Sequence, residues 1–589
     1  KGTLLVEAAK QAKIDIPVFC YHPKLAPVGA CRMCLVQIEK MPRLQTACST
    51  PVADGMVVYT RSAEATAAQR GVVEMLLTNH PLDCPVCDKG GECPLQDITF
   101  AYGPGVSRFY EPKRHFRKPI QLSDYIVLDR ERCIMCYRCV RFQREVAGDE
   151  SLTVVDRGSY SEIAVMPGRT FDSPFSGNTI ELCPVGALTS RLFRFTARCW
   201  DLTNVPSICS MCSVGCNVWV GVRDWSVKRI TARENTPVDD GWLCDRGRFT
   251  YAFANSAERL QQPLVRRDGQ LRPATWDEAL RAAARGLADA GSAAAGLASV
   301  QWTNEELYLF QKLFRVALGS NSVDHAPRQP LPAATPFGYD ALAGSIAALE
   351  TAQSVILVDV TPLVHQPVLD LRLKKAKRRG AKLVVIASEC IDLVADAAAW
   401  LQCPPGGEAR TFLALLKALA EQQGAALADA GLVATLAALD GPPVPQAAVA
   451  ALAAAAPGRA ALLYRRDLAA GTAGATFVAG VRALADLLGL SPASGATVAG
   501  PTSRVRSTSA CTQRCSPASA RPTRRRGRTW PRSGARRHRL AAWPPRTCRR
   551  PSPTARCVRS SWPASTRAPT RAGARRSTGC RFWSWPTSS

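Results

Sequence analysis

Residues 79–93 read NHPLDCPVCDKGGEC and hold one histidine and three cysteines in the pattern H-x3-C-x2-C-x5-C. These four residues are His80, Cys84, Cys87 and Cys93. Zn²⁺ accepts three Cys and one His, but four such ligands also suit one [4Fe–4S] cube with the imidazole at one iron. The segment is rich in Gly and Pro and follows a predicted helix over residues 69–80, so it does not read as a zinc knuckle. We therefore predict the cube, with zinc as the alternative.

Three further ligand sets surround this one, and we number all four in chain order. The first set has the pattern C-x10-C-x2-C-x13-C and consists of Cys20, Cys31, Cys34 and Cys48. We expect a helix capped by Thr3 before it and a β-hairpin turning at Asp54-Gly55 after it. A loop wrapped round a cofactor beside a small sheet suits a [2Fe–2S] centre held by four thiolates, and zinc is again the alternative.

The third set has the pattern C-x2-C-x2-C-x43-C-P, which is typical of bacterial ferredoxins. Its members are Cys133, Cys136, Cys139 and Cys183. A ferredoxin with two clusters would carry a further cysteine at position 143, where this sequence has Gln143. We therefore expect this module to hold one [4Fe–4S] cluster.

The fourth set has the pattern C-x2-C-x3-C-x27-C and consists of Cys209, Cys212, Cys216 and Cys244. It also suits one [4Fe–4S] cluster, with zinc as the alternative. Cys199 fits none of the four patterns, and we expect it to be a small buried residue.

The use of cysteine favours metal ligation over disulfides. Sixteen of the 23 cysteines lie in residues 1–244, and the chain opens KGTLLVEAAK, without the features of a secretion signal. Four consecutive sets favour a row of redox centres, which conducts electrons and needs no nucleophile or general base. Patterns such as G-x-S-x-G, H-E-x-x-H or a P-loop are absent from the sequence. The alternative from another class is a scaffold stabilised by zinc, with no redox role.

Length and charge add further limits. A chain of 589 residues should divide into several domains. It has no apolar run long enough to span a membrane, and its opening without Met suggests an incomplete N-terminus. The net charge of +27 is misleading, because residues 501–589 hold 22 Arg and no Lys, Asp or Glu. The rest has 53 basic and 48 acidic residues, a net charge of +5, which gives no case for nucleic-acid binding.

The segment 501–589 is anomalous in composition. It combines Arg, Ser, Pro and Thr with five Trp and shows no apolar period of 2 or 3.6. Our hypothesis is an out-of-frame reading of a GC-rich gene or a sequencing error, and the alternative is a disordered basic arm. Its five cysteines receive no role.

Residues 352–388 predict a βαβ unit with a parallel sheet. SVILVDV and AKLVVIA are apolar enough for buried strands, and VLDLRLKKAKRRG predicts a helix closed by Gly380 between them. The basic run KKAKRR is expected to be a solvated helix face. The Ala/Leu-rich segments 410–424 and 426–455 are expected to be packing helices. No G-x-G-x-x-G accompanies the unit, so nucleotide binding is not indicated.

Together these motifs resemble the large iron–sulfur subunit of respiratory complex I, which is the G subunit of bacterial NADH–quinone oxidoreductase, over residues 1 to about 500. RLQQPLVRRDGQLRPATWDEAL at 259–280 and the βαβ unit resemble the molybdopterin oxidoreductase domain of that subunit. The resemblance implies one [2Fe–2S] and three [4Fe–4S] clusters on the sixteen residues above, no molybdenum and no independent active site. In the family the first three clusters carry electrons from the NADH/FMN flavoprotein subunit toward the quinone-side iron–sulfur subunits. The fourth lies off that path.

The resemblance also implies the setting and the domain order. The whole complex couples electron transfer to proton translocation, and this subunit lies peripherally on the cytoplasmic side of the bacterial inner membrane, without a span of its own. The fold class is multidomain, α+β and α/β. The expected order is a [2Fe–2S] ferredoxin-like β-grasp domain (1–62) lacking its first strands, a helical segment with the one-His, three-Cys [4Fe–4S] set (63–105), a single-cluster [4Fe–4S] ferredoxin-like module (106–198), a [4Fe–4S] domain of molybdopterin-oxidoreductase type (199–255), a molybdopterin-oxidoreductase-like α/β domain (256–500) and the anomalous tail (501–589).

Two other redox families share part of this pattern. The runner-up is the molybdenum or tungsten catalytic subunit of an NAD-linked formate dehydrogenase. That subunit usually carries a second ferredoxin-type cluster and a Cys or selenocysteine on the metal, but this sequence has no cysteine between Cys244 and Cys390. An [FeFe]-hydrogenase shares the first two modules, but its later cysteine motifs are missing here.

Overall fold

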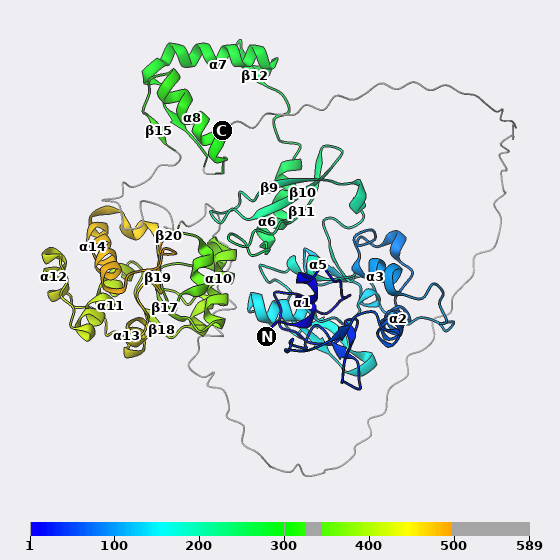
Figure 1. Cartoon of the computed structure of the whole chain (residues 1–589). Helices are drawn as coiled ribbons and strands as arrows, with labels where there is room; N and C mark the ends of the chain where they lie inside the picture. Colours follow the sequence, from blue (N-terminus) through cyan, green and yellow to red (C-terminus); the bar gives the residue numbers. More distant parts are fainter. Residues whose placement is uncertain (1, 300, 325–343, 498–589) are drawn as a thin grey trace, which may run out of the picture. The chain divides into compact units, whose positions relative to one another are not determined.

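The computed structural model describes residues 2–299, 301–324 and 344–497 (Figure 1). The chain divides into two units, Lys1–Ala520 and Arg521–Ser589, and all described residues belong to the first. The predicted anomalous tail, 501–589, lies outside the described residues. No helix in the described ranges is both long and apolar enough to cross a membrane.

The N-terminal part combines one helix with a three-stranded antiparallel sheet in the order β2-β1-β3. Its elements are α1 (Leu5–Gln11), β1 (Leu35–Ile38), β2 (Gln45–Thr46) and β3 (Val58–Tyr59). The predicted cap on Thr3 is wrong, because Leu4 occupies the N-cap and no side chain bonds the helix end.

The hairpin expected at Asp54-Gly55 is also wrong. β3 pairs with β1, whereas a hairpin there would have paired it with the strand that precedes the turn. The physical reason lies in α1, whose first backbone N–H groups bond the carbonyls of Ala47 and Thr50 at 3.0 and 2.9 Å. These bonds end β2 at Thr46 and tie the following chain to the helix.

The next two parts of the chain, which run from α2 to β8, contain both helices and strands. The elements are α2 (Ala63–Leu77), α3 (Pro94–Tyr102), β4 (Ile120–Gln121), β5 (Ile126–Leu128), α4 (Arg138–Phe142), β6 (Leu152–Val155), β7 (Glu162–Val165), α5 (Asn178–Leu182) and β8 (Leu188–Ser190). The helix predicted over 69–80 is present but begins earlier, where the Ser62 hydroxyl accepts from the Ala65 N–H at 3.2 Å. It ends at Leu77, so His80 lies in the loop beyond it.

The fourth part is an antiparallel sheet in the order β11-β10-β9, followed by a short helix. Its elements are β9 (Thr203–Ile208), β10 (Asn217–Arg223), β11 (Ser226–Ala232) and α6 (Asp245–Phe249). A smaller set of elements follows it along the chain. These are β12 (Leu264–Arg267), β13 (Gln270–Pro273), α7 (Trp276–Ala290), β14 (Gly296–Leu297), α8 (Asn304–Lys312) and β15 (Val323–Asp324).

Residues 354–497 form a five-stranded parallel sheet in the order β18-β17-β16-β19-β20. The elements are β16 (Ser354–Val358), α9 (Pro362–His365), α10 (Pro367–Arg378), β17 (Lys382–Ala387), β18 (Ala399–Gln402), α11 (Glu408–Gln423), α12 (Ala430–Ala437), α13 (Gln446–Ala453), β19 (Ala460–Arg465), α14 (Gly471–Leu488) and β20 (Gly495–Thr497). The predicted βαβ unit is confirmed as β16, α10 and β17.

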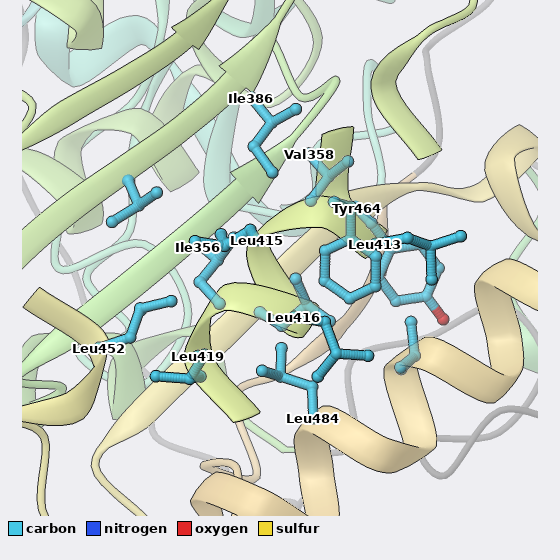
Figure 2. Packing of buried hydrophobic residues seen from close by; sticks show 14 of the residues in the cluster. Ile356, Val358, Ile386, Leu413, Leu415, Leu416, Leu419, Leu452, Tyr464 and Leu484 are labelled. Atoms are coloured by element: carbon cyan, nitrogen blue, oxygen red, sulfur yellow. The ribbon is translucent and has the colours of Figure 1, made fainter. Parts of the chain in front are cut away.

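The core of this sheet follows strand alternation. Ile356 and Val358 of β16 pack with Leu416 and Leu419 of α11 and with Leu484 of α14 (Figure 2). The alternate residues of β16 face the opposite core, which contains apolar side chains of α10. Both faces of the parallel sheet are therefore covered, as its continuous apolar strands require.

The prediction that KKAKRR is a solvated face is only partly correct, because Arg378 and Arg379 are exposed but the lysines are half-buried and several of the charges are paired. Lys375 lies 2.7 Å from Asp240 and 3.0 Å from Glu350, and Arg379 lies 2.9 Å from Glu350. These carboxylates come from segments distant in sequence, so a local sequence pattern could not predict the ion pairs.

Candidate metal centres

The first set converges beside β1. Cys20, Cys34 and Cys48 are buried and Cys31 is half-buried. The Cys20 N–H donates to Cys31 Sγ at 3.4 Å. Hydrogen bonds from Cys31 and then Cys48 hold the pKa of Cys20 far below its usual range, and a bond with Cys48 lowers that of Cys34. The four thiols therefore meet in one place.

The loop that carries this set directs backbone N–H groups toward sulfur. Gly29 and Arg32 both adopt φ of 60°, in the left-handed region that favours glycine. The N–H groups of Ala30 and Met33 hydrogen-bond the sulfurs of Cys20 and Cys31. Backbone donors aimed at sulfur stabilise thiolates, which are the ligands that iron–sulfur clusters require.

All four members of the second set line one cavity of about 230 Å³. Cys87 and Cys93 are buried, and Cys84 is exposed. Nδ1 of His80 is buried without a hydrogen-bond partner. Burial, followed by the charge of Arg132, lowers the pKa of His80 to about 4. A neutral, half-buried imidazole whose buried Nδ1 has no partner, beside three thiols, fits a metal ligand.

The third set lines an apolar cavity. All four cysteines line one small apolar cavity, together with side chains such as Ile163 and Val185. Met135 and Tyr137, on either side of Cys136, adopt φ of 49° and 61°, which curls the loop. The Met135 N–H donates to Cys133 Sγ at 3.4 Å.

Burial also controls the thiol chemistry of the third set. It raises the pKa of Cys133 and Cys136 to about 12 and that of Cys139 well above its usual range. Such thiols stay protonated in an apolar cavity, and a metal that coordinates them would replace the protons. The donor set therefore fits a buried cluster.

The fourth set is built on the β9–β10 connection and the start of α6. The Cys209 N–H donates to the Cys216 carbonyl at 2.8 Å, and Cys244 is the N-cap residue of α6. Gly247 allows close approach, since a Cβ there would lie 2.9 Å from Cys209 Sγ. Burial raises the pKa of Cys244 to about 12.

Cys199 departs from its prediction as a small buried residue. It is half-buried, and its Sγ donates to the Gly90 carbonyl at 3.4 Å, next to the second set. It does not line the cavity that His80 shares with its three cysteines.

The turn after Cys183 joins the second and third sets. Cys93 Sγ donates to the Pro184 carbonyl at 3.6 Å. A Cβ at Gly186 would overlap Cys87 Sγ, so only glycine fits at that contact. Sequence spacing gave no sign of this turn's role, because the two cysteines of the second set and Gly186 are far apart along the chain.

A half-buried arginine joins the first and third sets. The Arg138 guanidinium donates to the carbonyls of Tyr21 and Leu182, the neighbours of Cys20 and Cys183. Arg141 donates to the Cys20 carbonyl itself. The third set therefore adjoins both the first and the second.

Within the ranges 2–299, 301–324 and 344–497, no three His, Cys, Asp or Glu side chains converge closely enough to hold a single metal ion. The ligands of a cluster bind different irons, so they stand further apart than the ligands of one ion.

The molybdopterin-like domain offers a poor fit for an anionic pterin cofactor at its sheet edge. Open α/β sheets bind ligands at the carboxyl ends of the strands where the strand order reverses, which here lies between β16 and β19. Asp359 follows β16 there and pairs with Arg465 at 2.5 Å. The pair places a carboxylate where phosphates would bind and neutralises the nearby cation, so we derive no step through that cofactor.

Five family models match the chain in an order that confirms the predicted fold class. Their descriptions are 2Fe-2S iron-sulfur cluster binding domain (1–63), NADH-ubiquinone oxidoreductase-G iron-sulfur binding region (69–108), NADH-quinone oxidoreductase subunit 3, ferredoxin-like domain (123–189), Molybdopterin oxidoreductase Fe4S4 domain (202–256) and Molybdopterin oxidoreductase (259–520). The last match extends past residue 501, where the composition changes.

Curated relatives of the chain point to the same kind of protein. The chain is 40% identical over 448 residues to the G subunit of NADH-quinone oxidoreductase from Streptomyces coelicolor, covering 72% of this chain and 53% of the relative. It is 43% identical over 390 residues to the same subunit from Mycobacterium tuberculosis, covering 64% and 48%. It is 36% identical over 433 residues to NADPH-Fe(3+) oxidoreductase subunit alpha of Geobacter sulfurreducens, covering 72% and 51%.

The chain thus spans about half the length of the curated relatives that it matches. The order of the five matched regions and the identity to G subunits from several bacteria agree with the resemblance drawn from the cysteine patterns. Over these shared regions the chain is similar to NADH-quinone oxidoreductase G subunits.

Proposed function

We propose that this chain is the electron-conducting subunit of an NADH:quinone oxidoreductase. Electrons from the NADH/FMN flavoprotein subunit enter at the first set, cross the third and leave from the second toward the quinone-side iron–sulfur subunits. The contacts of the third set with both of the others carry the proposal. The fourth set, whose Cys244 packs on Leu182 beside the third, is proposed to lie off this row.

The sixteen predicted residues are proposed as the ligands of one [2Fe–2S] and three [4Fe–4S] clusters. When bound, the clusters supply one-electron redox chemistry. The chain's own residues hold them: buried thiols exclude water from the third set, backbone N–H groups stabilise the sulfurs of the first, and His80 supplies a neutral ligand at the second. The proposed domain boundaries are those expected from the sequence, and the domain 256–500 is proposed to hold no molybdenum.

The proposed setting is the peripheral arm of the complex, on the cytoplasmic side of a bacterial inner membrane. There the whole complex couples electron transfer to proton translocation. The single-cluster ferredoxin-like module argues against the formate dehydrogenase alternative, and metal analysis for molybdenum separates the two.

The similarity to the Geobacter protein favours a second candidate, in which the same row passes electrons from NADPH to a ferric acceptor. Reduction assays with a quinone and with a ferric salt, in the presence of the flavoprotein partner, separate these two.

The first prediction concerns metal content. The chain purified anaerobically is expected to contain about fourteen irons, and to give EPR signals of one two-iron and three four-iron clusters after reduction. Iron and acid-labile sulfide analysis measures this directly. A count near four zincs, or no acid-labile sulfide even after cluster reconstitution, would contradict the proposed function.

The second prediction concerns the imidazole ligand. His80→Cys is expected to retain a cube and to lower its midpoint potential by on the order of 100 mV, because a thiolate makes the site more negative. An EPR-monitored redox titration measures the shift, and the potential of the third cluster serves as the internal control. Loss of the cube would show that imidazole geometry matters more than charge.

A further inference from the structure

Arg132 is a buried cation on the wall of the second site. Its residue is 5% exposed, and it lines the same cavity as His80 and the three cysteines of that set. Its Nε and Nη2 donate to Asp83 Oδ2 at 3.0 and 2.8 Å, and its Nε lies 3.3 Å from Asp129 Oδ2. Two carboxylates therefore hold the guanidinium in place beside the proposed cluster.

Arg132 belongs to a small network of charged groups, in which Asp129 and Glu131 are also buried and Lys118 is exposed. Lys118 lies 3.0 Å from Asp83 and 3.9 Å from Asp129, and it also pairs with Glu131. Glu131 further accepts from the Phe116 N–H at 2.9 Å and lies 3.3 Å from His115 Nδ1. The network thus holds two cations and three carboxylates, a net charge of −1, and loss of Arg132 makes it −2 beside the site.

The charge of Arg132 acts on the second set in particular. Arg132 lines the cavity of the second set together with Cys87. It does not line the cavity that holds the four cysteines of the third set. Arg132 immediately precedes Cys133 in the chain, yet its side chain is directed to the second site.

We propose that the positive charge of Arg132 raises the reduction potential of the second cluster. It thereby favours electron transfer from the third cluster to the second. This inference rests on the proposed function. Reduction adds one negative charge to a cluster, and a cation held nearby in a medium of low dielectric stabilises the reduced form. Asp83 has the opposite effect, because it also lines the cavity and carries a negative charge.

The test uses the full chain with clusters reconstituted anaerobically, followed by EPR during a redox titration. Arg132→Gln is expected to lower the ratio of reduced to oxidised second cluster at fixed potential by about tenfold or more, which is a shift of 59 mV for a one-electron couple. Arg132→Lys, which keeps the charge, should stay within about threefold of wild type. Asp83→Asn should shift the ratio in the opposite direction.

Lys118→Gln is the matched control, because it removes one cation from the same network but its residue does not line the cavity. We expect it to change the ratio by less than about threefold. The proposal is overturned if Arg132→Gln leaves the second cluster unchanged while its iron content is intact. It is also overturned if Lys118→Gln or the third cluster shifts equally.

Two further readouts keep the test decisive. Should Arg132→Gln lose the second cluster, the sign of the Asp83→Asn shift decides, and an unchanged or lower potential overturns the proposal. The iron count of the wild-type chain separates the two levels of inference. A wild type without clusters refutes the proposed function, whereas a full complement with unmoved potentials refutes only the role of Arg132.

Discussion

A chain carrying Cys139→Ser is expected to lose the four irons of the third cluster and, with them, electron transfer from the first cluster to the second. Cys139 is buried and lines the third cavity with its three partners, so no exposed side chain can replace it as a ligand. The iron content should fall from about fourteen to about ten. Because the third set adjoins both of the others and is proposed to link them, electrons that reach the first cluster should stop there.

Iron analysis measures the loss, and freeze-quench EPR measures the transfer. After mixing with reduced flavoprotein partner, the signal of the first cluster should appear while that of the second stays absent. Cys199→Ser is the matched control, since Cys199 lies next to the second set but outside its cavity. It should keep about fourteen irons and normal transfer. A Cys139→Ser chain that still reduces its second cluster would show that the row runs otherwise.

The second large effect is expected from Gly186→Ala. A Cβ at position 186 would overlap Cys87 Sγ, and the turn that carries it also carries Cys183. One methyl group therefore displaces a ligand of the second set or the turn that supplies a ligand to the third. We expect loss of the second cluster, about four irons, together with a broadened EPR signal from the third.

Gly71→Ala is the control for this substitution. Gly71 lies within α2, and a Cβ there meets no atom within 4 Å. Alanine should stabilise that helix by up to about 1 kcal/mol and leave every cluster in place. Thermal unfolding and iron content are measured on both variants. A Gly186→Ala chain with full iron content and wild-type spectra would show that the turn can relax away from Cys87.

Local sequence patterns correctly predicted the elements whose contacting residues lie close together in the sequence. The βαβ unit was predictable because the strands β16 and β17 and the intervening helix α10 each follow their own period and adjoin in sequence. The Asp54-Gly55 hairpin failed because bonds from α1, about 50 residues away, end β2 at Thr46. The prediction for the basic run of α10 was only partly correct for the same reason, since its partner Asp240 lies 135 residues away.

The identity and chain order of the proposed ligands came from the sequence by itself. Three ligands of each set lie within one short loop or segment, and their spacing is a property of that segment alone. Only the tertiary structure decided which sets adjoin. The contacts of Gly186 with Cys87 and of Arg138 with the neighbours of Cys20 join residues about a hundred positions apart. Such proximity arises from burial of shared apolar surface and from buried hydrogen bonds, which leave no periodic trace in the sequence.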